Sequence, residues 1–443
     1  MMTTRTSQAS LPADWRSDRL KDVVAIRDEK VLIEDSTENY LELEDLEGGT
    51  GRILSRRDTL NVESAVTRFE KGDVLFGKLR PYLEKYCQPD FDGFCTGEIL
   101  AFFPKRISGR FLFYCMGADW LIQRCNAFAY GAKMPRVNWP KQLALFEFLL
   151  PPLPEQKRIA AYLDASCAAI DRAVATKQQQ LETLDALRKS IIQKAVTQGL
   201  NPEVKMKDSG VEWLGQVPSH WDVSRIKRHT SMLRGKFSHR PRNDPALYDG
   251  PFPFFQTGSI SSAEKYITEY KQTLNEDGLA VSRMFPKGIV VMSIAANIGD
   301  VAITGFEGCF PDSIVGFIPD HQTNTDFLFY VLKSMKQVML RSAILTTQLN
   351  LNYVRIGANR CAFPPKSEQE LIAKFLDRKM KELRRVTSVL QSQIATLTAY
   401  RKSLIHECVT GQRRITDSDV AAARDNGHGV AESSPLPPSA SPA

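Results

Sequence analysis

The chain has 443 residues, 43% of them hydrophobic and 25% charged, and a formal net charge of +7. This length allows two or three domains, each large enough to bury its own core, with the composition of an ordinary globular protein. No stretch approaches the roughly 18 consecutive apolar residues of a membrane span, and the polar start Met1–Ser10 has no signal-like core. We therefore expect a cytoplasmic protein, and the mildly basic balance favours a polyanionic partner without deciding it.

The predicted elements follow the same order in both halves of the chain. Residues 1–10 are expected to be disordered, and residues 11–150 to form an α+β domain with strands such as Val74–Gly77 and Ile99–Pro104 and a helix over Phe111–Asn126. A long helix is predicted over 151–198, opening at Pro151-Pro152-Leu153-Pro154-Glu155-Gln156, where prolines and acids suit a helix start.

After a linker at 199–216, the second half repeats this order. A second α+β domain is expected over 217–363, with strands at Ile289–Met292 and Ile314–Pro319 and a helix over Phe327–Ser342. A second long helix is predicted over 364–411. The tail 412–443 ends in Ser, Pro and Ala and is expected to be disordered, because it has little apolar surface to bury.

Sequence identity between the halves indicates a tandem duplication. Phe111-Leu112-Phe113-Tyr114 returns unchanged as Phe327–Tyr330, and Leu187-Arg188-Lys189-Ser190-Ile191 returns as Tyr400–Leu404. The period is far longer than the roughly 20–50 residues of solenoid repeats. A whole domain and its helix have therefore been duplicated.

Apolar residues in the two predicted long helices fall near heptad spacing, which favours their pairing as an antiparallel coiled coil. Lys177 and Gln180 interrupt the first seam, and Lys379 and Gln393 the second. The alternative is a pair of ordinary surface helices, each packed on its own domain. The residues predicted to pair are Leu163, Ile170, Leu184, Leu187, Leu383, Leu390, Leu397 and Leu404.

Motifs for catalysis or cofactor binding are missing. The sequence has no GxxxxGK[ST] loop, GxGxxG fingerprint or HExxH motif, and its eight cysteines have no metal-ligand spacing, so reduced and mostly buried thiols are expected. Asp90 with Glu98 is the nearest approach to a nuclease motif, but Leu100 stands where a lysine is expected. We predict no active site, no metal site and no cofactor.

Basic and amide side chains in loops are the candidates for contacting nucleic acid. Val223–Asn243 contains no acidic residue, which suits phosphate contact, although a solvated basic face would look the same. Loops at equivalent positions of the two halves carry cations in the first and amides in the second, and such side chains distinguish guanine from adenine. Asn138 with Asn352 and Trp139 with Tyr353 are expected to be structural instead. The predicted DNA-binding residues are Lys78, Arg80, Lys133, Arg136, Arg228, Arg234, Lys236, Gln348, Asn350 and Arg355.

The sequence resembles the specificity subunit of type I restriction–modification systems. The resemblance rests on Val211-Glu212-Trp213-Leu214-Gly215-Gln216-Val217-Pro218-Ser219-His220-Trp221, on Pro151–Gln156 and on Leu187–Ile192 with their repeats, and it covers about residues 11–412. It implies a non-catalytic subunit with two target-recognition domains, each binding one half of a split asymmetric double-stranded DNA target.

The resemblance also implies that the long helices separate the half-sites and dock two modification (methyltransferase) subunits, which use S-adenosylmethionine, and through them restriction/translocase subunits that use ATP and Mg²⁺. A helix of about 65 Å corresponds to roughly nineteen base pairs, an upper limit on that separation. The alternatives are a specificity subunit of a related restriction class, a self-contained restriction enzyme, and a coiled-coil scaffold that binds proteins.

Overall fold

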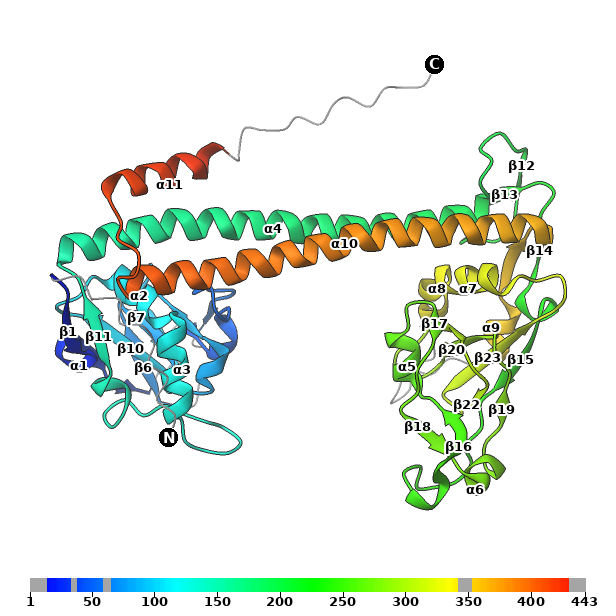
Figure 1. Ribbon diagram of the computed structural model, residues 1–443, viewed down its shortest axis with the longest axis horizontal. Helices are drawn as coiled ribbons and strands as arrows, with labels where there is room; N and C mark the ends of the chain where they lie inside the picture. Colours follow the sequence, from blue (N-terminus) through cyan, green and yellow to red (C-terminus); the bar gives the residue numbers. More distant parts are fainter. Residues whose placement is uncertain (1–13, 33–37, 59–64, 342–352, 430–443) are drawn as a thin grey trace. The chain divides into compact units, whose positions relative to one another are not determined.

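The computed structural model describes residues 14–32, 38–58, 65–341 and 353–429. The chain divides into two compact units, each described by itself (Figure 1). Unit 1 comprises Met1–Gln178 and Gln391–Ala443, and unit 2 comprises Gln179–Leu390. Each unit therefore contains one globular domain, the first part of the long helix that follows it, and the last part of the other long helix.

In unit 1, a four-stranded antiparallel sheet with the order β2-β10-β7-β8 packs against helices α2 and α3. A five-stranded sheet with the order β3-β6-β9-β4-β5 lies beside it, and β1 pairs with β11 to bring the ends of the domain together. The elements are β1 (Arg16–Arg19), α1 (Leu20–Val23), β2 (Val24–Arg27), β3 (Lys30–Val31), β4 (Asn39–Leu41), η1 (Leu43–Asp45), β5 (Arg57–Asp58), β6 (Val66–Phe69), β7 (Val74–Gly77), η2 (Pro81–Leu83), β8 (Tyr86–Cys87), β9 (Gly93–Cys95), β10 (Ile99–Pro104), α2 (Gly109–Met116), α3 (Asp119–Phe128), η3 (Leu143–Leu145) and β11 (Glu147–Leu150).

Unit 2 repeats this plan with the sheet β15-β23-β20-β21-β17, and β14 pairs with β24 as β1 does with β11. A second sheet has the order β18-β16-β22-β19. The linker contains β12, which forms a hairpin with β13. The elements are β12 (Met206–Asp208), β13 (Gln216–Pro218), β14 (Asp222–Arg225), η4 (Ile226–Arg228), β15 (Thr230–Arg234), η5 (Pro245–Leu247), β16 (Tyr248–Phe254), α5 (Thr257–Ser262), β17 (Tyr266–Ile267), β18 (Gln272–Leu274), α6 (Glu276–Ala280), β19 (Met284–Phe285), β20 (Val290–Ser293), β21 (Val301–Thr304), β22 (Gly308–Cys309), β23 (Ile314–Pro319), α7 (Thr325–Ser334), α8 (Lys336–Arg341), α9 (Tyr353–Ala358) and β24 (Arg360–Phe363).

Two long helices, α4 (Leu153–Gln198) and α10 (Lys366–Val409), follow the two domains. In unit 1 the beginning of α4 packs against the end of α10, where Ile159 and Leu163 share a core with Leu404 and Cys408. In unit 2 the end of α4 packs against the beginning of α10. The α+β class and the antiparallel packing of the long helices are therefore confirmed.

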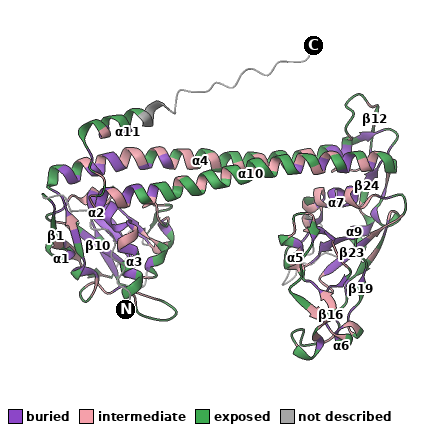
Figure 2. Cartoon of the chain, viewed as in Figure 1, coloured by how far each residue is buried: buried purple, intermediate pink, exposed green. Residues whose placement is uncertain are grey.

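Figure 2 shows that buried, half-buried and exposed residues alternate along α4 and α10. Leu163, Ile170 and Leu404 are buried, whereas Leu184, Leu383, Leu390 and Leu397 are half-buried, with Leu397 packed against the unit 1 core and Leu383 against the unit 2 core. The prediction for Leu187 is wrong, since its side chain is 46% exposed and the next seam position is Arg188. Lys177 and Gln393 are expected to interrupt the first and the second seam, and they contact each other: Lys177 Nζ donates a hydrogen bond to Gln393 Oε1 at 2.7 Å.

The prediction of a disordered tail from residue 412 is wrong for the part of the tail that the structure describes. Helix α11 (Asp417–Gly429) lies along α4 in unit 1 (Figure 1). Ile415, Val420 and Ala423 are buried in the unit 1 core, and Arg158 Nε donates to the Ile415 carbonyl at 2.8 Å. These three residues form a short apolar face. The tail as a whole has a polar composition because its end is rich in Ser and Pro, so this face is not evident from composition.

The observed elements correct the prediction for the helix inside each domain but do not include the start of the chain. Each helix predicted after the central sheet is divided in two, into α2 and α3 in unit 1 and α7 and α8 in unit 2. The break in unit 1 falls at Gly117, which is a poor helix former. The predicted disordered start, residues 1–10, lies outside the described residues. Within the described parts of the chain, no helix combines the length and apolarity that a membrane crossing requires.

Candidate nucleic-acid interface

A glutamine at the start of each long helix fixes the helix to its own domain. Gln156 Oε1 accepts a hydrogen bond from the Ser108 backbone N–H at 2.8 Å, and its Nε2 donates to the Pro151 carbonyl at 2.9 Å. Gln369 repeats both contacts with Asn324 and Pro364 at the same distances. Because both glutamines are 2% exposed, these bonds satisfy buried polar atoms. The Pro-Pro…Glu-Gln motif is therefore the joint between domain and helix.

A tyrosine from the repeated Phe-Leu-Phe-Tyr segment forms the second contact of this joint. Tyr114 Oη donates to Asp164 Oδ1 at 2.7 Å, and Tyr330 Oη donates to Asp377 Oδ1 at 2.7 Å. Burial raises the pKa of both phenols, so both remain protonated donors. The two halves thus share the tyrosine–aspartate bond that orients the domain on its helix, although Arg110 contacts the aspartate in unit 1 and Lys265 contacts it in unit 2.

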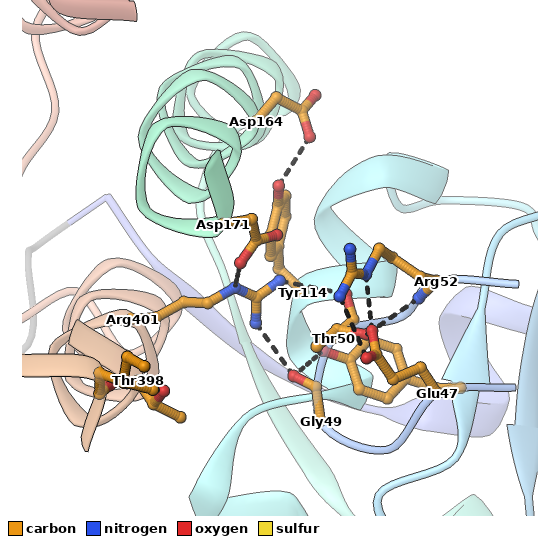
Figure 3. Close-up of polar contacts among 11 residues, drawn as sticks. Glu47, Gly49, Thr50, Arg52, Tyr114, Asp164, Asp171, Thr398 and Arg401 are labelled. Carbon is orange, nitrogen blue, oxygen red and sulfur yellow. Dashed lines mark hydrogen bonds and ion pairs between the residues drawn. The ribbon is translucent and has the colours of Figure 1, made fainter. Parts of the chain in front are cut away.

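In unit 1 the end of α10 is anchored by Arg401, as Figure 3 shows. Its guanidinium donates to the carbonyls of Gly49 and Thr50 at 3.0 and 3.1 Å and forms an ion pair with Asp171 at 3.1 Å. The neighbouring Lys402 pairs with Glu84 at 2.7 Å. The Arg-Lys-Ser motif at the end of the second repeat therefore binds the first domain.

Two loops of unit 1 come together at one surface. The Arg80 backbone N–H donates to the Pro135 carbonyl at 2.7 Å, and Val137 N–H donates to the Lys78 carbonyl at 3.0 Å. Arg80 has a φ of +50°, a left-handed conformation that non-glycine residues adopt rarely and at an energetic cost. We call the exposed residues of these loops the Arg80 patch: Arg80, Tyr82, Tyr130, Lys133 and Met134.

Exposed aromatic side chains distinguish the Arg80 patch from an ordinary basic surface. Tyr82 is 53% and Tyr130 55% exposed, beside two cations. Aromatic rings interleaved with cations suit contact with bases and phosphates. Sequence reasoning missed Tyr130, and its position just before Gly131 in a cation-bearing loop was the available signal.

Arg136 is less free than the sequence suggests. Its guanidinium contacts both carboxylate oxygens of Glu98, with Nε–Oε2 and Nη2–Oε1 distances of 3.0 Å. This hydrogen bonding raises the pKa of Arg136. Glu98 is therefore engaged as a structural partner, and the other carboxylate of the rejected nuclease motif, Asp90, pairs with Arg56.

In unit 2 the basic segment Val223–Asn243, which contains no acid of its own, is contacted by an acid from outside it. Asp312 forms ion pairs with Arg240 and Arg242, and its carbonyl accepts a hydrogen bond from Arg234 Nε at 2.5 Å. Arg228 on η4 and Arg355 on the adjacent α9, by contrast, are exposed and have no ion-pair partner among the described residues, as is also true of Lys236. Arg225 and Lys227 of the same segment are likewise exposed and have no ion-pair partner in the described parts of the chain, so five cations here are available to phosphate.

The predicted site residues thus fall into separate groups. Lys78, Arg80, Lys133 and Arg136 lie on two loops in contact in unit 1, whereas Arg228, Arg234, Lys236 and Arg355 belong to unit 2. Gln348 and Asn350 lie outside the described residues. All eight cysteines are buried, and no group of acidic, His or Cys side chains suited to a metal is found in the parts of the chain that the structure describes.

Comparison with known proteins gives consistent matches over both halves. The family model of the type I restriction modification DNA specificity domain matches residues 12–183 and 222–390. The type I restriction enzyme MjaVIII specificity subunit of Methanocaldococcus jannaschii is 22% identical, covering 91% of this chain and 94% of that protein.

Two solved structures share the fold. A chain from a type I R-M system, studied for complex assembly and conformational transition, has a TM-score of 0.73 at 18% identity over 91% of this chain and 100% of its own. The HsdS subunit from Thermoanaerobacter tengcongensis has a TM-score of 0.51 at 18% identity, over 92% and 99%. Because the family model covers most of both repeats, this chain belongs to the family of type I restriction–modification DNA specificity subunits.

Proposed function

We propose that this chain recognises a bipartite, asymmetric double-stranded DNA sequence for a type I restriction–modification complex. The observation that carries the proposal is the contrast within the duplication. The joints at Gln156 and Gln369 and at Tyr114 and Tyr330 are the same in both units. The polar residues of the equivalent loops differ in sequence, with cations in the first half and amides in the second, so we infer that two equivalent frames read unlike half-sites.

In unit 1 the Arg80 patch is the proposed reading surface. Its cations and aromatic rings lie on two loops whose backbones are hydrogen-bonded to each other, which holds the Cα positions of these residues in place. Phosphate contacts position a protein on DNA, and side chains in the groove read base edges. Lys78, Lys133 and Arg136 remain candidates for reading bases. To contact a base, the Arg136 guanidinium must break at least one of its hydrogen bonds to Glu98.

In unit 2 the proposed roles are divided between two kinds of residue. Arg228, Lys236 and Arg355 are exposed cations suited to phosphate. Arg234 is less available because its Nε is already bonded to the Asp312 carbonyl. Gln348 and Asn350 are proposed to read bases, since amides pair well with adenine.

Membership of the family supports a proposal about the partners. We propose that the paired parts of α4 and α10 dock two modification subunits and, through them, restriction/translocase subunits, and that the helices set the separation of the half-sites. The chain itself is proposed to supply no catalytic group, with S-adenosylmethionine, ATP and Mg²⁺ used by the partner subunits.

The test is DNA binding by the chain assembled with its modification subunit, over a salt series. Duplexes carry the methylated target, the target with either half shuffled, or both halves shuffled. We expect each shuffled half to weaken binding by at least tenfold while the salt slope remains steep. Binding that depends on salt but is indifferent to either half would overturn the proposal.

A further inference from the structure

A cavity in unit 2 occupies the place that Arg401 and its partners fill in unit 1. The residue that matches Arg401 in the other repeat is Arg188, near the end of α4. Arg188 lines two adjoining cavities of about 740 and 790 Å³, between the helices and the second domain. Volumes in this range are those of small-ligand sites.

Three replacements between the repeats explain why this cavity is open. Tyr86, which is fully buried in unit 1, corresponds by strand register to Val301, because Tyr86 pairs with Phe76 as Val301 pairs with Met292. Gly117, against which the Tyr86 ring packs, corresponds to Lys333. Space filled by a phenol in unit 1 is thus left open in unit 2 and contains an ammonium group.

The third replacement reverses a charge. Asp171, the acidic partner of Arg401, corresponds in the other repeat to Arg384. Arg384 pairs with Glu264, so it gives Arg188 a like charge in place of a counterion. No ion pair or hydrogen bond of the Arg188 guanidinium is found among the residues that the structure describes. Arg188 is therefore a half-buried arginine without the acceptors that its duplicate has.

Lys333 is in the same situation. Its ammonium lies 4.9 Å from the centre of the Phe329 ring, and no carboxylate pairs with it among the described residues. Burial, together with the positive charge of Arg188, lowers the pKa of Lys333 to about 8. Most acids that line the cavities already pair with other cations: Asp377 with Lys265, Asp300 with Lys336, Asp185 with Lys189 and Glu264 with Arg384. The remaining lining acids, Glu212 and Glu269, are exposed.

We propose that this cavity binds a phosphate group through Arg188 and Lys333. Two unpaired cations match the charge of a phosphate better than that of a single carboxylate, since a phosphate monoester carries about −1.5 to −2 at pH 7. Arginine offers a planar pair of donors to phosphate oxygens, and lysine adds a point charge. The phosphate comes either from a free phosphate compound or from the DNA backbone.

The first arm of the test uses inorganic phosphate and pyrophosphate, titrated calorimetrically into the full chain in a phosphate-free buffer. Arg188→Gln and Lys333→Gln should each weaken binding by about tenfold or more, as expected for a hydrogen bond between charged groups. Arg384→Asp restores the acid found in unit 1 and should also weaken binding. Lys194→Gln removes an exposed cation of the same helix outside the cavity and should leave it unchanged.

The second arm identifies the source of the phosphate. If it is the DNA backbone, Arg188→Gln lowers the slope of log affinity against log salt by about 0.9, and Lys194→Gln does not. If it is a free compound, the DNA slope is unchanged while phosphate binding is lost. The phosphate arm does not require DNA recognition, so the two proposals fail separately. Wild-type phosphate affinity in folded Arg188→Gln and Arg384→Asp would overturn this one.

Discussion

Replacing Arg401 by glutamine should destabilise unit 1, whereas the same change at Arg188 should not destabilise unit 2. The Arg401 side chain is 8% exposed and donates two hydrogen bonds to carbonyls. It also forms an ion pair with Asp171, whose side chain is 29% exposed, and the substitution removes all three contacts. Hydrogen bonds from charged groups contribute about 1.5–3 kcal/mol each, but water can reach Asp171 once the arginine is gone. We expect a loss of about 2–4 kcal/mol in the free energy of unfolding of unit 1.

The duplicate supplies the matched control. Arg188→Gln removes the corresponding side chain where no partner is found among the described residues, so a change within about 0.5 kcal/mol is expected. Urea unfolding measures both changes, and hydrogen exchange of the Gly49–Tyr86 segment assigns the first to unit 1. Equal destabilisation by the two substitutions would contradict this contrast, in which Arg401 is held by hydrogen-bond acceptors and Arg188 has none among the described residues.

Further expectations concern recognition, helix packing, the tail and the thiols. Arg136→Ala should change the preference for one half-site, while Arg228→Ala should weaken binding evenly across sequences, both measured on duplex panels; even effects from both would place the reading loop elsewhere. Leu397→Asp should disrupt helix packing and assembly with the modification subunit, measured by co-purification, whereas the exposed Leu187→Asp should not; assembly retained by both would count against the paired-helix dock. Ending the chain at Gln412 removes buried Ile415 and Val420 and should destabilise unit 1 by about 1–3 kcal/mol in urea, with no loss expected if α11 does not pack there. Burial raises the pKa of Cys167 to about 11 and of Cys95 to about 12, so a thiol reagent at pH 8 should react only after unfolding; rapid labelling of the native chain would contradict their burial.

The frame of the molecule is predictable from the sequence because it depends on local patterns. Strands such as Val74–Gly77 and Ile99–Pro104 have the bounds expected from short apolar runs between turn residues. The long helices begin within two residues of the predicted position, where the Pro-Pro pair ends the preceding strand. Repetition of the same motifs makes the duplicated organisation visible in the sequence itself.

Side-chain partners could not be predicted, because they come from segments far apart in the sequence. Glu98 engages Arg136 across 38 residues, and Asp312 neutralises part of a segment that contains no acid of its own. Spacing alone places Leu187 in the seam, but Leu187 lies three residues and Arg188 four residues beyond Leu184, and only the packed helix decides between them. Helix α11 escapes prediction because the composition of the tail hides its few apolar residues.

The most direct test of the central claim is the sequence methylated by the chain together with its modification subunit. Methylated positions in DNA are mapped for the wild-type complex and for a variant in which residues 11–150 come from another member of the family. We expect two unlike half-sites with a fixed gap, of which the replacement changes one and leaves the other and the gap unaltered. A single uninterrupted palindrome, or a replacement that leaves the methylated sequence unchanged, would contradict it.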